Sequence, residues 1–167
     1  MRSRGESGGD SLGPVPDRAP VDELQGVIEE LLATTRASRV TLRMDQPPEF
    51  FPVAREALAP GVESIRNVQA PNMPRQPVVL EIVKGRQVIQ NDCLSAFADP
   101  DFQVMLDLYG GMRAQIVTPV MVDGAVKAII SVHQLGSPRA WTDDEIDACH
   151  QAAQRVHALA SSASSER

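Results

Sequence analysis

The most nucleophilic side chains in this sequence are its two cysteines, Cys93 and Cys149. Thiol redox catalysis needs an attacking thiolate and a second thiol that resolves the oxidised product. Cys93 falls in a predicted loop, whereas Cys149 falls on a core-facing position of a predicted helix, so the two thiols are not expected to meet. Turnover at Cys93 would therefore require an external reductant. This arrangement favours a protein that is not an enzyme.

The three histidines are His133, His150 and His157, and they fit neither an H-E-x-x-H nor a C-x-x-C pattern. On a helix, His150 and His157 would lie roughly 10 Å apart, too far to share one ion. No metal site is therefore expected. His133 ends a predicted strand, where it is either a hydrogen-bonded structural residue or an axial ligand to haem iron.

Two arginines, Arg43 and Arg113, lie in predicted strands. A guanidinium group matches the geometry of carboxylate and phosphate groups, so either arginine is a candidate to bind an anionic ligand. The alternative is a salt bridge to one of the 22 acidic residues of the chain.

Composition limits the partners and the compartment. The 167 residues include 22 acidic and 16 basic side chains, which give a formal net charge of −6 and a pI near 5.0. Such a charge repels nucleic acid and anionic lipid. We therefore expect a protein that binds neither nucleic acid nor membrane. The chain has few cysteines, no signal peptide and no apolar stretch near ~20 residues, which predicts a cytoplasmic protein.

Low-complexity ends flank one folded unit. Residues 1–20 mix Gly, Ser and Pro with charges and are expected to form a disordered tail. The serine-rich residues 161–167 are expected to form a second one. Residues 21–160 remain as a single domain of ordinary apolar content, without internal repeats.

Hydrophobic periodicity predicts the elements of the first half. The 4-3-4 spacing of Leu24, Ile28, Leu31 and Thr35 indicates a helix over 22–36. In the next strand Val40, Leu42 and Met44 alternate with polar residues, which is the period of a strand with two different faces. The further elements expected are strands at 38–45, 50–58 and 88–92, an irregular connection at 59–77 and a short helix at 78–85.

The second half begins with a helix whose start is marked by Asp99 and Pro100, because Asp can cap free N–H groups and Pro sacrifices no hydrogen bond at the first position. A hairpin over 114–134 follows, with Asp123-Gly124 as a type I′ turn. Pro119 cannot donate to the sheet, so we expect it at an edge or a bulge.

The last helix, over 142–160, begins with a capping box of Thr142 and Glu145 and a hydrophobic staple of Trp141 and Ile146. Its apolar residues recur at 3-4-3-4 spacing. They either cover the helix's own sheet or form a dimer seam with the first helix. The residues of this stripe are Ile146, Cys149, Ala153, Val156 and Ala160.

The stretch RAQIVTPVMVDGAVKAIISVHQLGSPRAWTDDEIDACHQAAQRV, over 113–156, resembles the C-terminal half of GAF domains. It has, in the family's order, an apolar strand with a proline, a D-G hairpin, a strand ending near a His and a W-T-x-x-E helix start. LEIVKGRQVIQND and ASRVTLRMD resemble the middle of the family and its first sheet strand. The resemblance covers about 21–160, so the chain looks like a stand-alone, single-domain GAF protein.

The resemblance implies an α/β (α+β), GAF- or PAS-like fold with a central antiparallel sheet of about five to six strands. Terminal helices would cover one face, and loops and short helices would cover a ligand pocket on the other. GAF domains typically bind cyclic nucleotides, tetrapyrroles, other small metabolites, or only another protein. The candidate ligand-binding residues are Thr41, Arg43, Asn91, Asp92, Tyr109, Arg113 and Gln115.

The expected function is that of a small-molecule-binding sensory domain. No output domain fits outside the folded unit, so the signal would pass to a separate signalling protein, and the helices at 22–36 and 142–160 would form a homodimer. The cofactor and the ligand stay unknown. After Asn91-Asp92 the sequence reads CLSAF instead of the N-K-x-D-E type motif of cyclic-nucleotide members.

Two alternatives stay open. One is a protein-interaction module without a ligand, which the low aromatic content of 4% favours. The other is an enzyme resembling free methionine-R-sulfoxide reductases of the GAF family, with Cys93 as the reactive thiol. Cys149-His150 resembles the Cys-His pair at which some members attach a bilin, but it falls in the terminal helix.

Overall fold

A computed structural model gives the structure of residues 15–165. The elements are α2 (Val15–Thr35), β1 (Arg39–Met44), β2 (Val53–Leu58), the 3-10 helix η1 (Met73–Arg75), α3 (Pro77–Ile82), β3 (Val88–Gln90), the 3-10 helix η2 (Cys93–Ser95), α4 (Pro100–Leu108), β4 (Met112–Val122), β5 (Ala125–Leu135) and α5 (Asp143–Ser165). Much of the tail expected over 1–20 lies outside the described residues, and α2 already begins at Val15. The tail expected over 161–167 lies outside them only at 166–167, because α5 continues to Ser165.

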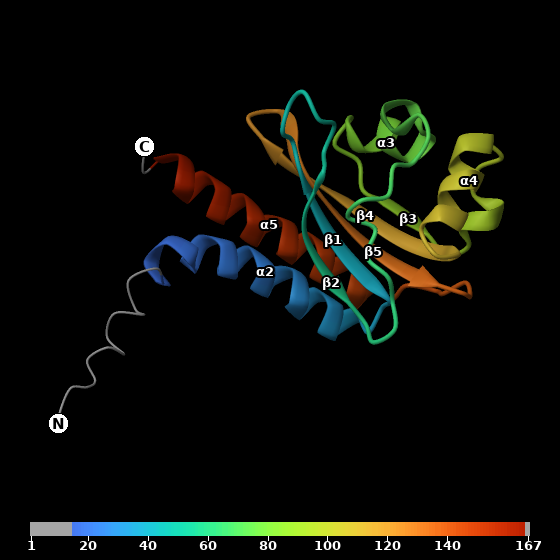
Figure 1. Ribbon diagram of the computed structural model, residues 1–167, viewed down its shortest axis with the longest axis horizontal. Helices are drawn as coiled ribbons and strands as arrows, with labels where there is room; N and C mark the ends of the chain where they lie inside the picture. Colours follow the sequence, from blue (N-terminus) through green and yellow to red (C-terminus); the bar gives the residue numbers. More distant parts are fainter. Residues whose placement is uncertain (1–14, 166–167) are drawn as a thin grey trace.

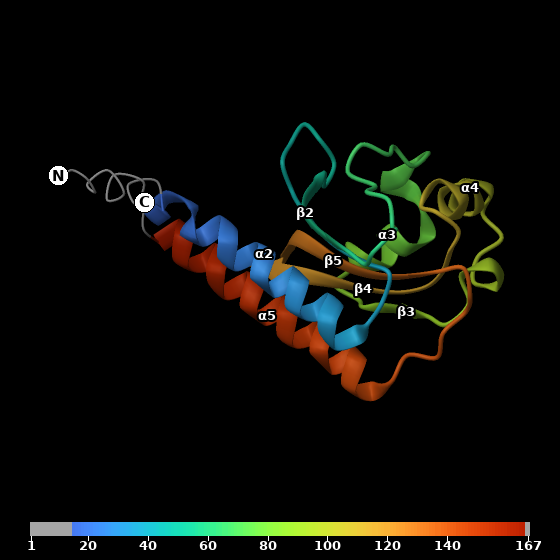
Figure 2. The same ribbon diagram turned by 60° about the horizontal axis from the view of Figure 1, so that its bottom comes forward.

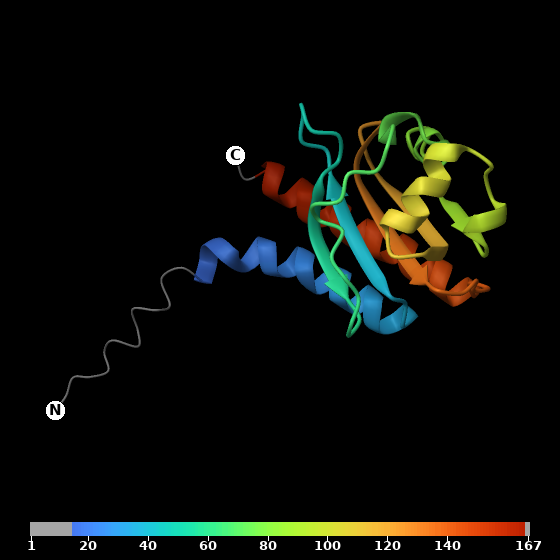
Figure 3. The same cartoon turned by 45° about the vertical axis from the view of Figure 1, so that its right-hand side comes forward.

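The strands form one antiparallel sheet in the order β2-β1-β5-β4-β3. It separates two layers, with α2 and α5 on one side and α3, α4 and the long loops on the other (Figures 1 and 3). This is the α+β, GAF-like architecture that the sequence predicted, with five strands. Figure 2 shows α2 and α5 running side by side in opposite directions, so that the start of α2 and the end of α5 lie at the same end of the molecule.

The side chains of β1 alternate between the two faces of the sheet and so contribute to both layers. Val40 and Leu42 are fully buried in the core under α2 and α5, whereas Arg39, Thr41 and Arg43 take the opposite parity and belong to the other face. Because β1 lies inside the sheet and both of its faces are covered, even its polar residues Arg39 and Thr41 are buried. Side chains on that second face are therefore the ones able to build a site.

Helix α5 covers its own sheet, the first of the two interpretations of its apolar stripe. Cys149, Ala153 and Val156 lie in the core cluster shared with α2 and the sheet, and Val156 has no exposed surface. A dimer seam through Val156 is therefore wrong, because a side chain already packed inside the protomer cannot also pack against a second copy. Any partner of these helices must use their outer surfaces.

The hairpin of β4 and β5 has the predicted turn. Both Asp123 and Gly124 have positive φ, 53° and 81°, as a type I′ turn requires. Pro119 lies on β4 beyond the last residue paired with β3, Val117, and close to a register shift between Val120 and Met121. The expected position of Pro119, at an edge or a bulge, is thus confirmed.

The helix starts are set by local hydrogen bonds that the sequence predicted. Asp99 accepts from the N–H of Phe102 at 2.9 Å and begins α4. Thr142 and Glu145 exchange the two hydrogen bonds of a capping box, at 3.1 and 3.0 Å, and begin α5. None of the helices within residues 15–165 has the length and apolar character needed to cross a membrane.

Candidate functional site

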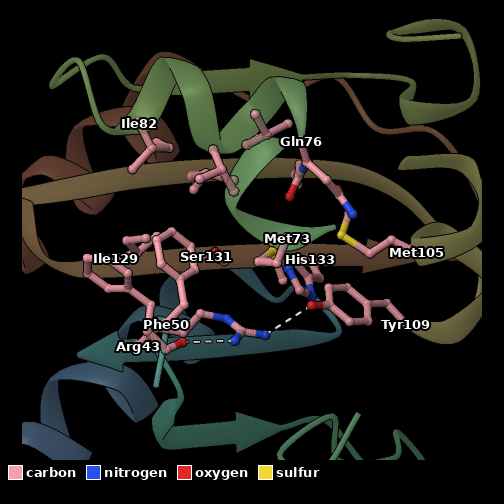
Figure 4. Close-up of a pocket in the computed structure, with 15 residues that line it drawn as sticks. Arg43, Phe50, Met73, Gln76, Ile82, Met105, Tyr109, Ile129, Ser131 and His133 are labelled. Carbon is pink, nitrogen blue, oxygen red and sulfur yellow. Dashed lines mark hydrogen bonds between the residues drawn. The ribbon is translucent and has the colours of Figure 1, made fainter. Parts of the chain in front are cut away.

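A cavity of about 50 Å³ lies on the sheet face opposite α2 and α5. Its floor comes from β1, β4 and β5, and α3, α4 and the loops close it from above (Figure 4). Most of the wall is apolar, and a few polar side chains point in, which is the usual composition of a small-molecule site. The lining residues are Arg43, Phe50, Phe51, Met73, Gln76, Val78, Val79, Ile82, Met105, Tyr109, Gln115, Val117, Ile129, Ser131 and His133.

A row of polar side chains crosses four strands beneath this cavity. Arg39 on β1 pairs with His133 on β5, which pairs with Gln115 on β4, which pairs with Gln90 on β3. All four are at most 7% exposed. Buried polar groups must be hydrogen-bonded to be tolerated, so the partners of this row decide what it can offer to a ligand.

Arg39 is a buried cation held by neutral acceptors. Its guanidinium donates to the carbonyl oxygens of Tyr109 and Glu63, each at 3.1 Å, and to Nδ1 of His133 at 3.0 Å. Among the described side chains no carboxylate lies within salt-bridge reach of it. Burial lowers the pKa of Arg39 from its usual value, while the more distant Glu56 raises it. Because a guanidinium group stays protonated in proteins, Arg39 places a positive charge without a paired anion beside His133 and Tyr109 of the cavity wall.

The bond with Arg39 fixes the tautomer of His133. A guanidinium group only donates, so Nδ1 of His133 must accept, and the proton of the neutral imidazole sits on Nε2. Burial, and then the charges of Arg39 and Arg43, hold the pKa of His133 well below its usual range, so the ring stays neutral. It also stacks on Tyr109, with ring centroids 5.7 Å apart. His133 thus presents a fixed N–H donor.

At the other end of the row, Gln115 is oriented by Gln90 and Cys93. The Cys93 thiol donates to Oε1 of Gln90 at 3.4 Å, and Nε2 of Gln115 donates to the same oxygen at 2.8 Å. The carbonyl oxygen of Gln115 is left as an acceptor without a partner among the described residues. No hydrogen bond joins Gln115 to His133, so the row is interrupted where both residues line the cavity.

Arg43 lies where the cavity meets a larger cleft. Its guanidinium donates to the hydroxyl of Tyr109 and to the carbonyl oxygen of Phe51, both at 3.0 Å (Figure 4). The cleft, of about 430 Å³, shares Arg43, Phe50 and Met73 with the cavity and continues along residues 66–70. These three residues therefore lie where the small cavity opens into the larger cleft.

The structure brings three of the predicted ligand-binding residues, Arg43, Tyr109 and Gln115, to the cavity wall. Thr41 lies on the same face opposite Ser131, fully buried and with an unpartnered hydroxyl, but not on the wall.

Asn91, Asp92 and Arg113 lie outside the wall and make structural contacts. Asn91 accepts from the N–H of Trp141 at 3.3 Å. Asp92 caps η2 and forms a 3.4 Å ion pair with Arg113, the salt bridge that was the alternative for this arginine.

Sequence reasoning missed several wall residues. Ser131 and His133 alternate with the core residues Ile130 and Val132 along β5, so strand periodicity was a signal that could have placed them on the site face. Gln76 comes from the irregular connection, where its amide donates to the carbonyl of Pro71 at 2.7 Å, and no periodic pattern marks it. The described side chains of His, Cys, Asp and Glu form no cluster that could hold a metal ion.

The family model of the GAF domain matches residues 20–158, so the chain belongs to the GAF domain family. No curated protein matches the chain. Among solved structures, it is similar to the GAF3 domain of Slr1393 from Synechocystis sp. PCC6803 in its photoproduct state, with a TM-score of 0.73, 20% identity and coverage of 87% of this chain and 96% of that one. It is also similar to the phycocyanobilin-bound GAF domain of a cyanobacterial phytochrome, with a TM-score of 0.75, 15% identity and coverage of 100% and 99%.

A third similar structure is the GAF domain of the cyanobacteriochrome TePixJ, with a TM-score of 0.72, 20% identity and coverage of 83% of this chain and 86% of that one. At these identities the likeness concerns the fold. Neither cysteine of this chain lines the cavity. Cys149 lies in the core on the opposite face of the sheet, and Cys93 is buried against Gln90.

Proposed function

We propose that this GAF domain is a sensory domain that binds a small metabolite in the cavity beneath α3 and passes the signal to another protein. The observation that carries the proposal is the cavity itself, with apolar walls and a few oriented polar groups. Two of those groups, His133 and Gln115, are oriented by hydrogen bonds to the protein that leave one donor and one acceptor for a ligand.

The size of the cavity favours a metabolite over a tetrapyrrole. A cavity of about 150 Å³ accepts benzene, so one of about 50 Å³ suits only a few atoms unless its walls move. Covalent attachment of a bilin to a thiol finds no support either, because both cysteines are buried away from the cavity. The same burial argues against the reductase alternative, since the thiolate is the reactive species and burial raises the pKa of Cys93 to about 12.

Native mass spectrometry of the protein purified gently from its own host tests this proposal. We expect a bound mass that is lost on denaturation and a preparation without visible absorption. In Ser131→Leu, whose side chain would fill the cavity, the bound mass should disappear, whereas it should persist in the control Ser137→Leu, in the exposed loop after β5. A wild-type protein that carries no mass, and that no compound of a host extract stabilises against heat, would overturn the proposal and leave the interaction module.

We also propose that the domain forms a homodimer in the cytoplasm through the outer surfaces of α2 and α5. A groove of about 120 Å³ runs between these helices and is lined by their exposed sides, including Glu30, Thr34 and Gln151. Sedimentation equilibrium should give a dimer for the wild type and a folded monomer for Thr34→Arg. The control Val104→Arg, on the exposed side of α4, should stay dimeric. A wild-type monomer at high concentration would refute the homodimer.

A further inference from the structure

The polar groups of the cavity are arranged in two sets, and each set defines part of a ligand. Arg43 lies at the mouth and His133 with Gln115 lies on the floor. This inference rests on the proposed function and names the chemical class of its ligand.

The mouth of the cavity carries positive charge without a paired anion. Arg43 lies at the mouth and has no carboxylate partner among the described side chains, and neither does Arg39 beneath the floor. No Asp or Glu lines the cavity itself, and the cleft outside it is lined by Glu49 together with Arg43 and Arg66. The protein as a whole carries a net charge of −6, so this region has the opposite sign to the average surface. A cation next to apolar walls attracts an anion strongly, because little water screens it.

Arg43 is also bonded in a way that a ligand can replace. Its two hydrogen bonds go to a hydroxyl and to a carbonyl, which are neutral acceptors. A hydrogen bond to a carboxylate is roughly twice as strong as one to a neutral acceptor, and the guanidinium fork matches its two oxygens. A carboxylate at the mouth would therefore be favoured over the internal partners.

The floor offers one donor and one acceptor side by side. His133 presents Nε2–H because Nδ1 is occupied by Arg39, and Gln115 presents its carbonyl oxygen because its amide nitrogen is occupied by Gln90. These two residues are direct cross-strand neighbours. A hydroxyl group satisfies both, since it accepts from the imidazole and donates to the amide oxygen. The hydroxyl of Ser131, on the same face, has no partner within the described residues and can join them.

We propose that the cavity binds a small hydroxycarboxylate, with its carboxylate on Arg43 at the mouth and its hydroxyl between His133 and Gln115 on the floor. The short carbon chain between the two groups contacts Ile82, Met105 and Ile129. The cavity volume of about 50 Å³ limits the whole acid to about three or four carbons, because the carboxylate occupies the mouth and only the remaining carbons and the hydroxyl enter.

Isothermal titration of the full chain with three matched compounds tests both halves of the proposal. The probes are 3-hydroxybutyrate, butyrate, which lacks the hydroxyl, and 3-hydroxybutyramide, which lacks the charge; lactate and 3-hydroxypropionate extend the series. We expect at least one hydroxy acid to bind about tenfold or more tightly than both its deoxy and its amide counterpart. Equal binding of acid and amide, or no binding of any hydroxy acid by the folded protein, would overturn the proposal.

Single substitutions then test which side chain binds the carboxylate and which binds the hydroxyl of the ligand. Arg43→Gln should lower the affinity for the hydroxy acid about tenfold or more and leave the affinity for the amide unchanged. The control Arg86→Gln, at an exposed arginine paired with Glu81, should alter neither affinity. Gln115→Leu should remove the preference for the hydroxyl. Because the three-compound comparison uses the wild type, poor folding of a variant does not decide the result.

The failure of this inference differs from the failure of the proposed function. A neutral compound, or one without a hydroxyl, found bound to the host-purified protein would refute the hydroxycarboxylate while leaving the sensory role intact. Absence of any bound or stabilising compound would remove both.

Discussion

Arg39 and His133 form a buried hydrogen bond, with Nη1 of the guanidinium 3.0 Å from Nδ1 of the imidazole. The two residues are direct partners on β1 and β5, yet they are 94 positions apart in the sequence. Their bond sets the protonation of His133 and therefore the hydrogen-bonding character of the cavity floor.

Acidification should destabilise the fold through His133. The pKa of His133 in the folded protein lies well below the value near 6.5 of an exposed histidine, so the unfolded chain binds more protons once the pH falls below about 6.5. The free energy of unfolding should therefore fall with decreasing pH by up to about 1.4 kcal/mol per unit from this group. Urea denaturation between about pH 7.5 and 5.5 measures this slope.

The slope should shrink in His133→Gln, whose amide oxygen can still accept from Arg39. His150→Gln, on the exposed side of α5, is the matched control and should keep the wild-type slope. An unchanged slope in His133→Gln would contradict the burial of a neutral imidazole at this position.

Removal of Arg39 should be among the most destabilising changes in the sheet. Arg39→Met fills a similar space but leaves two buried acceptors, on Tyr109 and His133, and the partly buried carbonyl of Glu63 without their donor. Each unpaired group costs about 1–3 kcal/mol, so we expect the free energy of unfolding to fall by about 3 kcal/mol or more. Chemical denaturation of Arg39→Met beside Arg86→Met, at an exposed arginine, checks this, and a loss equal to that of the control would be inconsistent with the network.

Truncation of Val156 tests the role of α5. Because this side chain is fully buried between α5 and the sheet, Val156→Ala should cost about 2 kcal/mol and Val156→Asp should prevent stable folding. Ala158→Ser, exposed on the same helix, should change the stability by less than about 0.5 kcal/mol. Circular dichroism shows whether each variant folds, and thermal melts give the change in stability. A well-folded Val156→Asp protein would show that α5 does not pack as described.

Both thiols should be inert in the native protein. Burial raises the pKa of Cys93 and of Cys149 to about 12, so few thiolates exist at pH 8 and neither is reachable by reagents. Reaction with a chromogenic disulfide should be slow under native conditions and should release both thiols in denaturant. Rapid modification of Cys93, or turnover of free methionine sulfoxide that Cys93→Ser abolishes, would revive the reductase alternative.

The fold followed largely from local signals in the sequence. The capping box of Thr142 and Glu145, the Asp99 cap and the Asp123-Gly124 turn each act through neighbours a few residues away, so their structure could be predicted at the right positions. The start of α2 could not, because propensity and periodicity near a helix end are weak and its first residues lie in a proline-rich segment.

The candidate site could be predicted only in part from the sequence. Arg43, Tyr109 and Gln115 were recognisable as polar residues on predicted elements, but Asn91, Asp92 and Arg113 carried the same signal and instead hold η2 and the loop before α5. The sequence by itself determined the alternation of side chains along β1, the starts of α4 and α5 and the turn at Asp123-Gly124. Only the tertiary structure decided that Arg39, His133, Gln115 and Gln90 share one row, because strand register is set by packing across the whole sheet.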